Sequence, residues 1–149
     1  MPAGCHFLLV EDDENDAFLF QRTLAKVGGS TLHHCPDTQA AKRYLLGEEH
    51  FSDRQRFPFP QAIFCDLRIG LNSGLDLLKW LRTHALLLAV PLIIFSGDLS
   101  DHEVTQVYEA GANSVIIKPA SLGEFEQKIR AITTFWCLAQ KPSVISPKG

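Results

Sequence analysis

Short apolar runs alternate with amphipathic stretches along most of the chain. Runs such as HFLLV (6–10) and VPLIIFSGD (90–98) are typical of buried strands, and DAFLFQRTLAKV (16–27) carries apolar residues at helical spacing. The pattern therefore predicts five strands and five helices in alternation. The predicted strands are 6–10, 31–35, 61–67, 90–98 and 113–119, and the predicted helices are 16–27, 37–46, 75–87, 101–111 and 121–139.

This alternation indicates an α/β fold in which helices cover both faces of a parallel sheet. We expect one domain over residues 5–138, followed by a tail, 139–149, with the composition of a frayed chain end. The polar, proline-containing segment 47–60 is expected to be a surface loop. Its aromatic side chains are expected to pin this loop to the body of the domain: Phe51, Phe57 and Phe59.

Composition narrows the class of protein. A net charge of −3 and a pI near 6.0 give no electrostatic footprint for nucleic acid or an anionic membrane. The longest apolar runs are too short to span a bilayer, and the first residues do not resemble a secretory signal. We therefore expect a cytoplasmic protein. The cysteines show no metal-ligand spacing and are predicted to be small buried residues: Cys5, Cys35, Cys65 and Cys137.

Polar residues follow the predicted strands at the ends where ligands bind to parallel sheets. An acidic cluster follows the first strand, Asp66 follows the third, and a Lys-Pro pair follows the fifth. The full set is Glu11, Asp12 and Asp13, then Asp66, then Ser96 and Gly97, then Lys118 and Pro119. Each feature alone is more often a helix cap or a turn. Their joint occurrence at strand ends indicates a single site.

The chemistry of this set points to phosphoryl transfer. Carboxylates held close together repel one another, and Mg²⁺, which prefers oxygen ligands, would relieve that repulsion. Lys118 and Ser96 could contact phosphate oxygens, and the carboxylate of Asp66 is a natural nucleophile that would form an acyl phosphate. Asp13 is interpreted as a cap for the first helix, with an outer role at the metal as the alternative.

Four motifs in this order, VEDD, CDLRIGLNSG, IIFSG and IIKP, resemble the receiver domain of two-component response regulators. The resemblance covers roughly residues 5–138. The last helix ends in a Phe-Trp pair, and in this the chain is similar to the small response regulators that accompany bacterial phytochromes. The resemblance implies a flavodoxin-like sheet of strand order 2-1-3-4-5 and a bacterial signalling protein.

The resemblance also implies roles for individual residues. Asp66 would be phosphorylated by a histidine kinase, in this case of the phytochrome type, or by a phosphotransfer protein. Glu11, Asp12, Asp66 and the carbonyl of Arg68 would hold Mg²⁺. Ser96 and Lys118 would contact the phosphoryl group, and the Lys118–Pro119 peptide bond would be cis.

Several positions depart from the usual family pattern. Val115 stands where the family usually has a Tyr or Phe ring that moves on activation. The signal would then have to pass through Ser96, Gly97 and the rest of loop 96–100 to the helix beginning near Asp101, with blunted signalling as the alternative. Arg68 places a long cation two residues past the acceptor, where it would shield the acyl phosphate, weaken metal binding or point to solvent. His33 and His34 are expected to be structural, with a phosphotransfer or metal role as the alternative.

We therefore expect a stand-alone phosphorylatable switch that acts by protein contact and is not a metabolic enzyme. Phe135 and Trp136 near the end of the last helix are predicted to form a homodimer interface. The alternatives are a pseudo-receiver that binds partners without phosphorylation, an Asp-dependent phosphohydrolase and a small-molecule-binding module. The phosphohydrolase is disfavoured because the triplet Asp66-Leu67-Arg68 lacks a second carboxylate.

Overall fold

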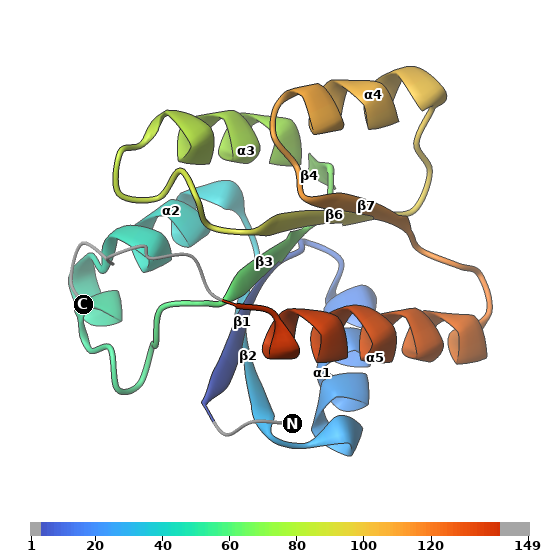
Figure 1. The fold of residues 1–149 in the computed structure, drawn as a ribbon, viewed down its shortest axis with the longest axis horizontal. Coiled ribbons are helices and arrows are strands. Elements are labelled where there is room, and N and C mark those ends of the chain that lie inside the picture. Colours follow the sequence, from blue (N-terminus) through green and yellow to red (C-terminus); the bar gives the residue numbers. More distant parts are fainter. Residues whose placement is uncertain (1–3, 141–149) are drawn as a thin grey trace.

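A five-stranded parallel sheet forms the centre of the protein, seen in a computed structural model that describes residues 4–140 (Figure 1). The strand order is β2-β1-β3-β6-β7, which is the predicted order 2-1-3-4-5 and confirms the expected flavodoxin-like fold. The strands are β1 (Cys5–Val10), β2 (Ser30–Cys35), β3 (Ala62–Cys65), β6 (Leu92–Ser96) and β7 (Ser114–Ile117).

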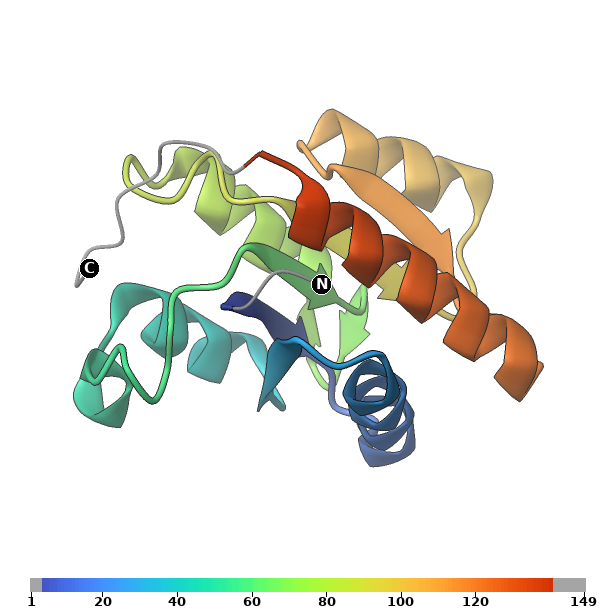
Figure 2. The same ribbon diagram turned by 60° about the horizontal axis from the view of Figure 1, so that its bottom comes forward.

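Helices cover both faces of this sheet (Figure 2). The helices α1 and α5 lie side by side on one face, and α2, α3 and α4 lie on the other. Their bounds are α1 (Glu14–Val27), α2 (Thr38–Leu46), α3 (Gly74–Thr83), α4 (Asp101–Glu109) and α5 (Leu122–Leu138), and a short 3-10 helix, η1, spans Glu49–Ser52.

Each central strand contributes side chains to two separate cores. In β3, Ile63 packs on the side of α2 and α3, whereas its neighbour Phe64 packs on the side of α1 and α5. Both side chains are fully buried, which is why the strand reads as a continuous apolar run. On the α1 and α5 side, aromatic rings pack against one another in the core, with Phe20 tilted against Phe64 and Phe95 edge-on to Phe125.

The loop between α2 and β3 is packed as predicted. Phe51 is buried, and the ring of Phe57 packs edge-on against it with centroids 5.2 Å apart. The ring of His33 lies 5.7 Å from that of Tyr44, within the same aromatic cluster. The imidazole Nε2 of His34 lies 2.6 Å from the backbone oxygen of Glu11. Both histidines therefore have structural contacts.

Some local features of the structure were not predicted from the sequence. A small antiparallel hairpin, β4 (Arg68–Ile69) and β5 (Asn72–Ser73), follows the third strand of the sheet and turns at Gly70, whose φ of 56° favours glycine. Strands of two residues carry no periodicity, so the pattern could not reveal them. The third helix also ends at Thr83, earlier than predicted, where the His84 amide caps the carbonyl of Leu81.

All four cysteines are buried, as predicted, but two of them form a bond that the sequence did not indicate. Cys5 at the start of β1 and Cys137 in the last turn of α5 form a disulfide, with their Cα atoms 5.8 Å apart. These residues are 132 positions apart, so their proximity depends on the fold and not on any local spacing. Cys35 and Cys65 are free and buried, as predicted.

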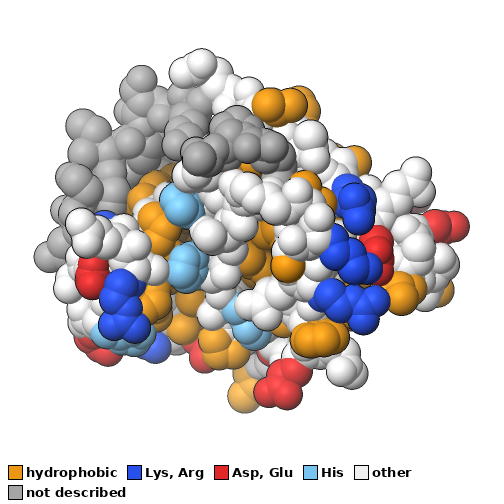
Figure 3. Space-filling model, turned by 90° about the horizontal axis from the view of Figure 1, so that it is seen from below, with side chains coloured by type: hydrophobic (Ala, Val, Ile, Leu, Met, Phe, Trp, Pro, Cys, Tyr) orange, Lys and Arg blue, Asp and Glu red, His pale blue; other side chains and the backbone are white. Residues whose placement is uncertain are grey.

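Charges are mixed on the face that carries α1 and α5. Lys and Arg side chains gather there beside acidic ones (Figure 3). Arg22 and Lys26 of α1 both pair with Glu126 of α5, at 3.7 Å and 3.3 Å. Among residues 4–140, no helix is both long enough and apolar enough to cross a membrane.

Candidate functional site

The register of the parallel strands brings the predicted polar residues to one edge of the sheet. Val10 lies opposite Cys65 in the pairing of β1 with β3, so the residues that follow, Glu11 and Asp66, emerge side by side. Ser96 ends β6 and lies opposite Ile117 of β7, which precedes Lys118. Four strand ends therefore deliver their polar residues to a common site.

The ammonium group of Lys118 is the centre of this site. Its Nζ donates to Glu11 Oε1 at 2.5 Å, to Asp66 Oδ2 at 2.8 Å and to Asp16 Oδ2 at 2.8 Å. The Lys118 side chain is only 9% exposed. The other oxygen of Asp66 accepts hydrogen bonds from Ser96 Oγ at 2.6 Å and from the Arg68 amide at 3.0 Å. Both oxygens of Asp66 are thus held in fixed positions.

Burial and pairing act against each other on the charges of this site. Burial raises the pKa of Glu11 to about 7, although the contact with Lys118 opposes the shift. Burial also raises the pKa of Asp66, but hydrogen bonds from Lys118 and Ser96 outweigh it and leave that pKa below its usual value. For Lys118, burial lowers the pKa, and the three carboxylates reverse this and hold the ammonium charged. Asp66 is therefore ionised at neutral pH.

Asp12 and Asp13 have separate roles beside this centre. Asp12 Oδ2 accepts a hydrogen bond from the Gly70 amide at 2.7 Å, which ties the β4–β5 hairpin to the end of β1. Asp13 Oδ1 accepts from the amides of Asn15 and Asp16 at 2.9 Å and 3.0 Å. This bonding makes Asp13 the N-cap of α1, as the capping interpretation predicted.

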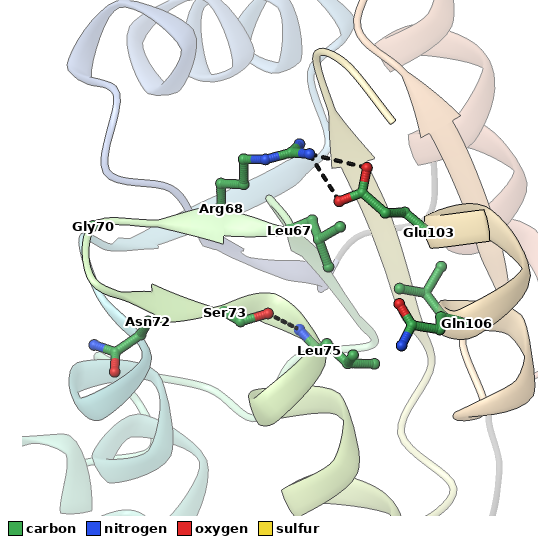
Figure 4. Close-up of a pocket in the computed structure, with 9 residues that line it drawn as sticks. Leu67, Arg68, Gly70, Asn72, Ser73, Leu75, Glu103 and Gln106 are labelled. Atoms are coloured by element: carbon green, nitrogen blue, oxygen red, sulfur yellow. Dashed lines mark hydrogen bonds and ion pairs between the residues drawn. The ribbon is translucent and has the colours of Figure 1, made fainter. Parts of the chain in front are cut away.

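The Arg68 side chain is exposed, and its guanidinium reaches α4. Its Nη2 donates to both carboxylate oxygens of Glu103, at 2.8 Å and 3.0 Å (Figure 4). Its Nη1 donates to the backbone oxygen of Asp98 at 2.6 Å. The same Glu103 accepts from the Ser100 amide and completes the capping box of α4. Beneath this bridge lies a pocket of about 330 Å³ with Leu67, Leu75 and Val107 in its lining.

Gly74 allows α3 to begin directly against the backbone of Asp66. A Cβ atom at this position would lie 2.3 Å from the backbone oxygen of Asp66 and 3.1 Å from the sulfur of Cys65. Backbone atoms at the end of a central strand are held by its neighbours, so a side chain here would displace the end of β3.

Two sequence predictions concern the segment around β7. The prediction of a cis Lys118–Pro119 bond is wrong, because no peptide bond among residues 4–140 is cis. The trans form is the intrinsically preferred one, and it already allows Lys118 to reach all three carboxylates. Val115 is partly buried, and its amide donates to the hydroxyl of Tyr108 at 3.1 Å, so α4 is also bonded to β7.

The donor set fits a hard divalent cation in its chemistry. Glu11, Asp12 and Asp66 supply carboxylate oxygens, and Glu11 is a buried carboxylate whose raised pKa shows the cost of its charge. These carboxylates point toward Lys118 and Gly70, and among the described residues no three acidic, His or Cys side chains are arranged around one metal position. Metal binding would therefore require Glu11 and Asp66 to move relative to Lys118.

The sequence reasoning missed Asp16 and Glu103. Asp16 lies in the first turn of α1, which begins at Glu14, earlier than predicted. The sequence did hold a signal for Asp16, because it is an acidic residue in the first helical turn after an acidic strand end. Glu103 could be recognised as a capping-box residue from the spacing S-D-H-E, but its contact with Arg68 could not.

Comparison with known proteins agrees with this fold. The family profile described as the response regulator receiver domain matches residues 7–130. Response regulator Rcp1 of Synechocystis is 26% identical over 133 residues, which cover 87% of this chain and 86% of that protein. The probable methanogenesis regulatory protein FilR2 of Methanothrix harundinacea is 27% identical over 130 residues, covering 87% of this chain and 81% of that protein.

Two solved structures are similar over nearly their whole length. One is the phosphorylated cyanobacterial phytochrome response regulator RcpA, with a TM-score of 0.86, 26% identity and coverage of 95% of this chain and 100% of that one. The other is response regulator RPA3017, described in red light signaling of R. palustris, with a TM-score of 0.86, 25% identity and coverage of 94% and 99%. With the family profile spanning most of its length, this chain belongs to the response regulator receiver domain family.

Proposed function

We propose that this protein is a phosphorylatable switch in a two-component pathway, with Asp66 as the acceptor. The observation that carries the proposal is the position of the two Asp66 oxygens. One accepts from Lys118 and the other from Ser96, and both donors are groups that could move onto a phosphoryl group. The lowered pKa of Asp66 keeps its carboxylate available for attack.

The proposed reaction transfers a phosphoryl group from a phosphohistidine of a kinase or a phosphotransfer protein. An Asp66 carboxylate oxygen forms a bond to phosphorus, the phosphorus–nitrogen bond breaks, and the released imidazole nitrogen takes a proton. Lys118 and Ser96 are placed to donate to the phosphoryl oxygens as charge builds on them. A cleft of about 390 Å³ beside Lys118, with Gly97 and Pro119 in its lining, gives a donor side chain a route to the site.

Receiver domains bind a divalent cation at their acidic site, and we propose that Mg²⁺ is held here by Glu11, Asp12, Asp66 and the carbonyl of Arg68. When bound, Mg²⁺ would neutralise charge on the phosphoryl oxygens. The donor chemistry supports this assignment, and the cation would replace Lys118 as the counter-charge of Glu11.

We propose that the output leaves the site through α4. Ser96 would follow the phosphoryl group and pull on Gly97 and the loop that leads to α4. Arg68 bridges the acceptor loop to Glu103 on the first turn of α4. This connection supports an output that does not depend on an aromatic residue at Val115.

The partners that we propose are a histidine kinase, suggested by the relatives, and a second copy of the chain, suggested by the exposed end of α5. The similarity to RcpA and RPA3017 supports a phytochrome-type histidine kinase as the donor. Phe135 is 60% exposed on α5, and we propose that this end of the helix pairs with a second copy of the chain, which then acts on a downstream protein. Trp136 is half-buried against the core and would support that surface from below.

We propose that residues 5–138 form the receiver domain. The protein would act as a signalling switch in the cytoplasm and not as a metabolic enzyme. Of the expected tail, 139–149, all but Ala139 and Gln140 lies outside the described residues. The Cys5–Cys137 disulfide is uncommon in a reducing compartment. Both sulfur-bearing side chains are buried, which would protect the bond from thiol reductants.

Intact-protein mass spectrometry tests the proposal. The protein is incubated with acetyl phosphate, with and without Mg²⁺, beside an Asp66→Asn variant. We expect a Mg²⁺-dependent gain of one phosphoryl group in the wild-type protein and none in the variant. Equal labelling of Asp66→Asn would overturn the acceptor assignment. No labelling, together with no Mg²⁺ binding by calorimetry, would favour the pseudo-receiver alternative.

A further inference from the structure

Asp16 is a carboxylate at the centre of the site that the proposed reaction does not use. Its Oδ2 accepts a hydrogen bond from Lys118 Nζ at 2.8 Å, which equals the distance from Nζ to Asp66. Asp16 comes from α1 and not from a strand end, and its side chain is 30% exposed. It therefore lies between the buried ammonium and solvent.

The three partners of Lys118 differ in what happens to them during the reaction. Glu11 would turn toward the cation, and the Asp66 oxygen would lose its negative charge when it becomes part of an acyl phosphate. Asp16 takes part in neither event, so its contact with Lys118 can persist from the free protein to the phosphorylated one. Of the three partners, Asp16 alone would keep its negative charge and would not become a ligand of the cation.

We propose that Asp16 is a positioning residue that anchors the Lys118 ammonium beside the acceptor while its other two partners are lost to the cation and the phosphoryl group. This inference rests on the proposed phosphorylation of Asp66. It assigns to Asp16 an action through Lys118, without contact to the phosphoryl group itself.

The anchor is rigid because Asp16 lies in a capped helical turn. The Asp16 amide donates to Asp13 Oδ1 at 3.0 Å, and Asp13 is the N-cap of α1. A lysine side chain has several rotatable bonds and loses much rotational freedom when it is fixed, so one permanent partner reduces the cost of holding it in place. An ammonium has three N–H donors, and a bond to Asp16 leaves two of them for phosphoryl oxygens.

A carboxylate beside Lys118 could also act in the opposite way, by drawing the ammonium from the phosphoryl group. The geometry favours the anchoring role, because Lys118 contacts Asp16 and Asp66 at the same distance without leaving either. The two roles predict opposite signs. Removing an anchor slows phosphorylation, whereas removing a competitor speeds it.

The experiment compares Asp16→Ala and Asp16→Asn with the wild-type protein and with a matched control, Glu14→Ala. Glu14 is an exposed acidic residue of the same helical turn, so its removal changes the net charge equally without touching Lys118. The initial rate of phosphorylation is measured by intact mass over a range of acetyl phosphate concentrations. The Mg²⁺ dissociation constant is measured by calorimetry, and all rates are taken well below each thermal midpoint.

We expect Asp16→Ala to lower the maximal rate by about tenfold, which is typical for the loss of one charge-assisted hydrogen bond. Asp16→Asn keeps an acceptor oxygen in the same place and should recover part of that rate. The Mg²⁺ dissociation constant should change by less than the rate does, and Glu14→Ala should behave as the wild type.

Three results would overturn the inference while the proposed function stands. These are an unchanged or faster rate in Asp16→Ala, an equal loss in Glu14→Ala, and a loss explained by weaker Mg²⁺ binding alone. If the wild-type protein takes up no phosphoryl group under any condition, the proposed function fails and the anchoring role fails with it.

Discussion

The disulfide between Cys5 and Cys137 should account for a large part of the stability of this domain. The perturbation is a double variant, Cys5→Ala/Cys137→Ala, compared with the wild-type protein with and without a strong thiol reductant. The bond joins the first strand to the last helical turn and closes a loop of 132 positions. Breaking it releases nearly the whole chain in the unfolded state.

The magnitude follows from the entropy of closing that loop. For a separation of 132 residues, the chain-entropy relation gives about 5 kcal/mol at 25 °C, and measured values for disulfides are more often about 2–4 kcal/mol. Domains of this size are stable by about 5–15 kcal/mol in total. With a urea m-value of about 2 kcal/mol per molar, the unfolding midpoint should fall by roughly 1–2.5 M.

The assay is urea unfolding followed by far-UV circular dichroism at matched protein concentration. Reductant should lower the midpoint of the wild-type protein and leave the double variant unchanged, because the variant has no bond to reduce. Thiol titration of the denatured, unreduced wild-type protein should find only Cys35 and Cys65. Four reactive thiols, or a wild-type midpoint that reductant does not move, would refute the reasoning.

Three further predictions concern the site. The pKa of Glu11, raised by burial to about 7, exceeds the usual 4.5, so the folded apo-protein binds more protons than the unfolded chain between these values. Its thermal midpoint in EDTA should therefore fall as pH rises from about 4.5 to 7, and Glu11→Gln should flatten that slope; an identical slope in the variant would contradict the assignment. Gly74→Ala should lower the free energy of unfolding by about 1–3 kcal/mol and slow phosphorylation, because its Cβ would lie 2.3 Å from the Asp66 carbonyl oxygen. Wild-type values in urea unfolding and mass spectrometry would contradict this steric argument. Glu103→Gln should weaken the bridge to Arg68 and speed hydrogen exchange at the start of α4 in the unphosphorylated protein. Hydrogen exchange at the wild-type rate would argue against an output path through this bridge.

Much of the fold is predictable because it rests on local periodicity. A strand buried on both faces, such as β3 (Ala62–Cys65), must be apolar along its length, and an amphipathic helix must repeat its apolar residues with the helical period. The same periodicity sets which residues follow each strand. Glu11, Asp66 and Lys118 could therefore be assigned to one edge of the sheet before any coordinates were known.

Errors occurred where local pattern carries no information. The β4–β5 hairpin has strands of two residues, too short for any period to appear. The Lys118–Pro119 bond was predicted to be cis by resemblance, although nothing in the local sequence requires it and the bond is trans. Cys5 and Cys137 have no characteristic spacing, and their bond depends on where α5 ends relative to β1.

The sequence by itself determined the alternation of strands and helices, the order of the motifs and the edge of the sheet at which the polar residues gather. Only the tertiary structure decided which charges meet within it. Lys118 contacts Asp16 across 102 positions and Glu11 across 107, and Arg68 reaches Glu103 across 35. Helix and strand periods are properties of neighbouring residues, whereas these pairings depend on the register of the sheet and on the position of each helix over it.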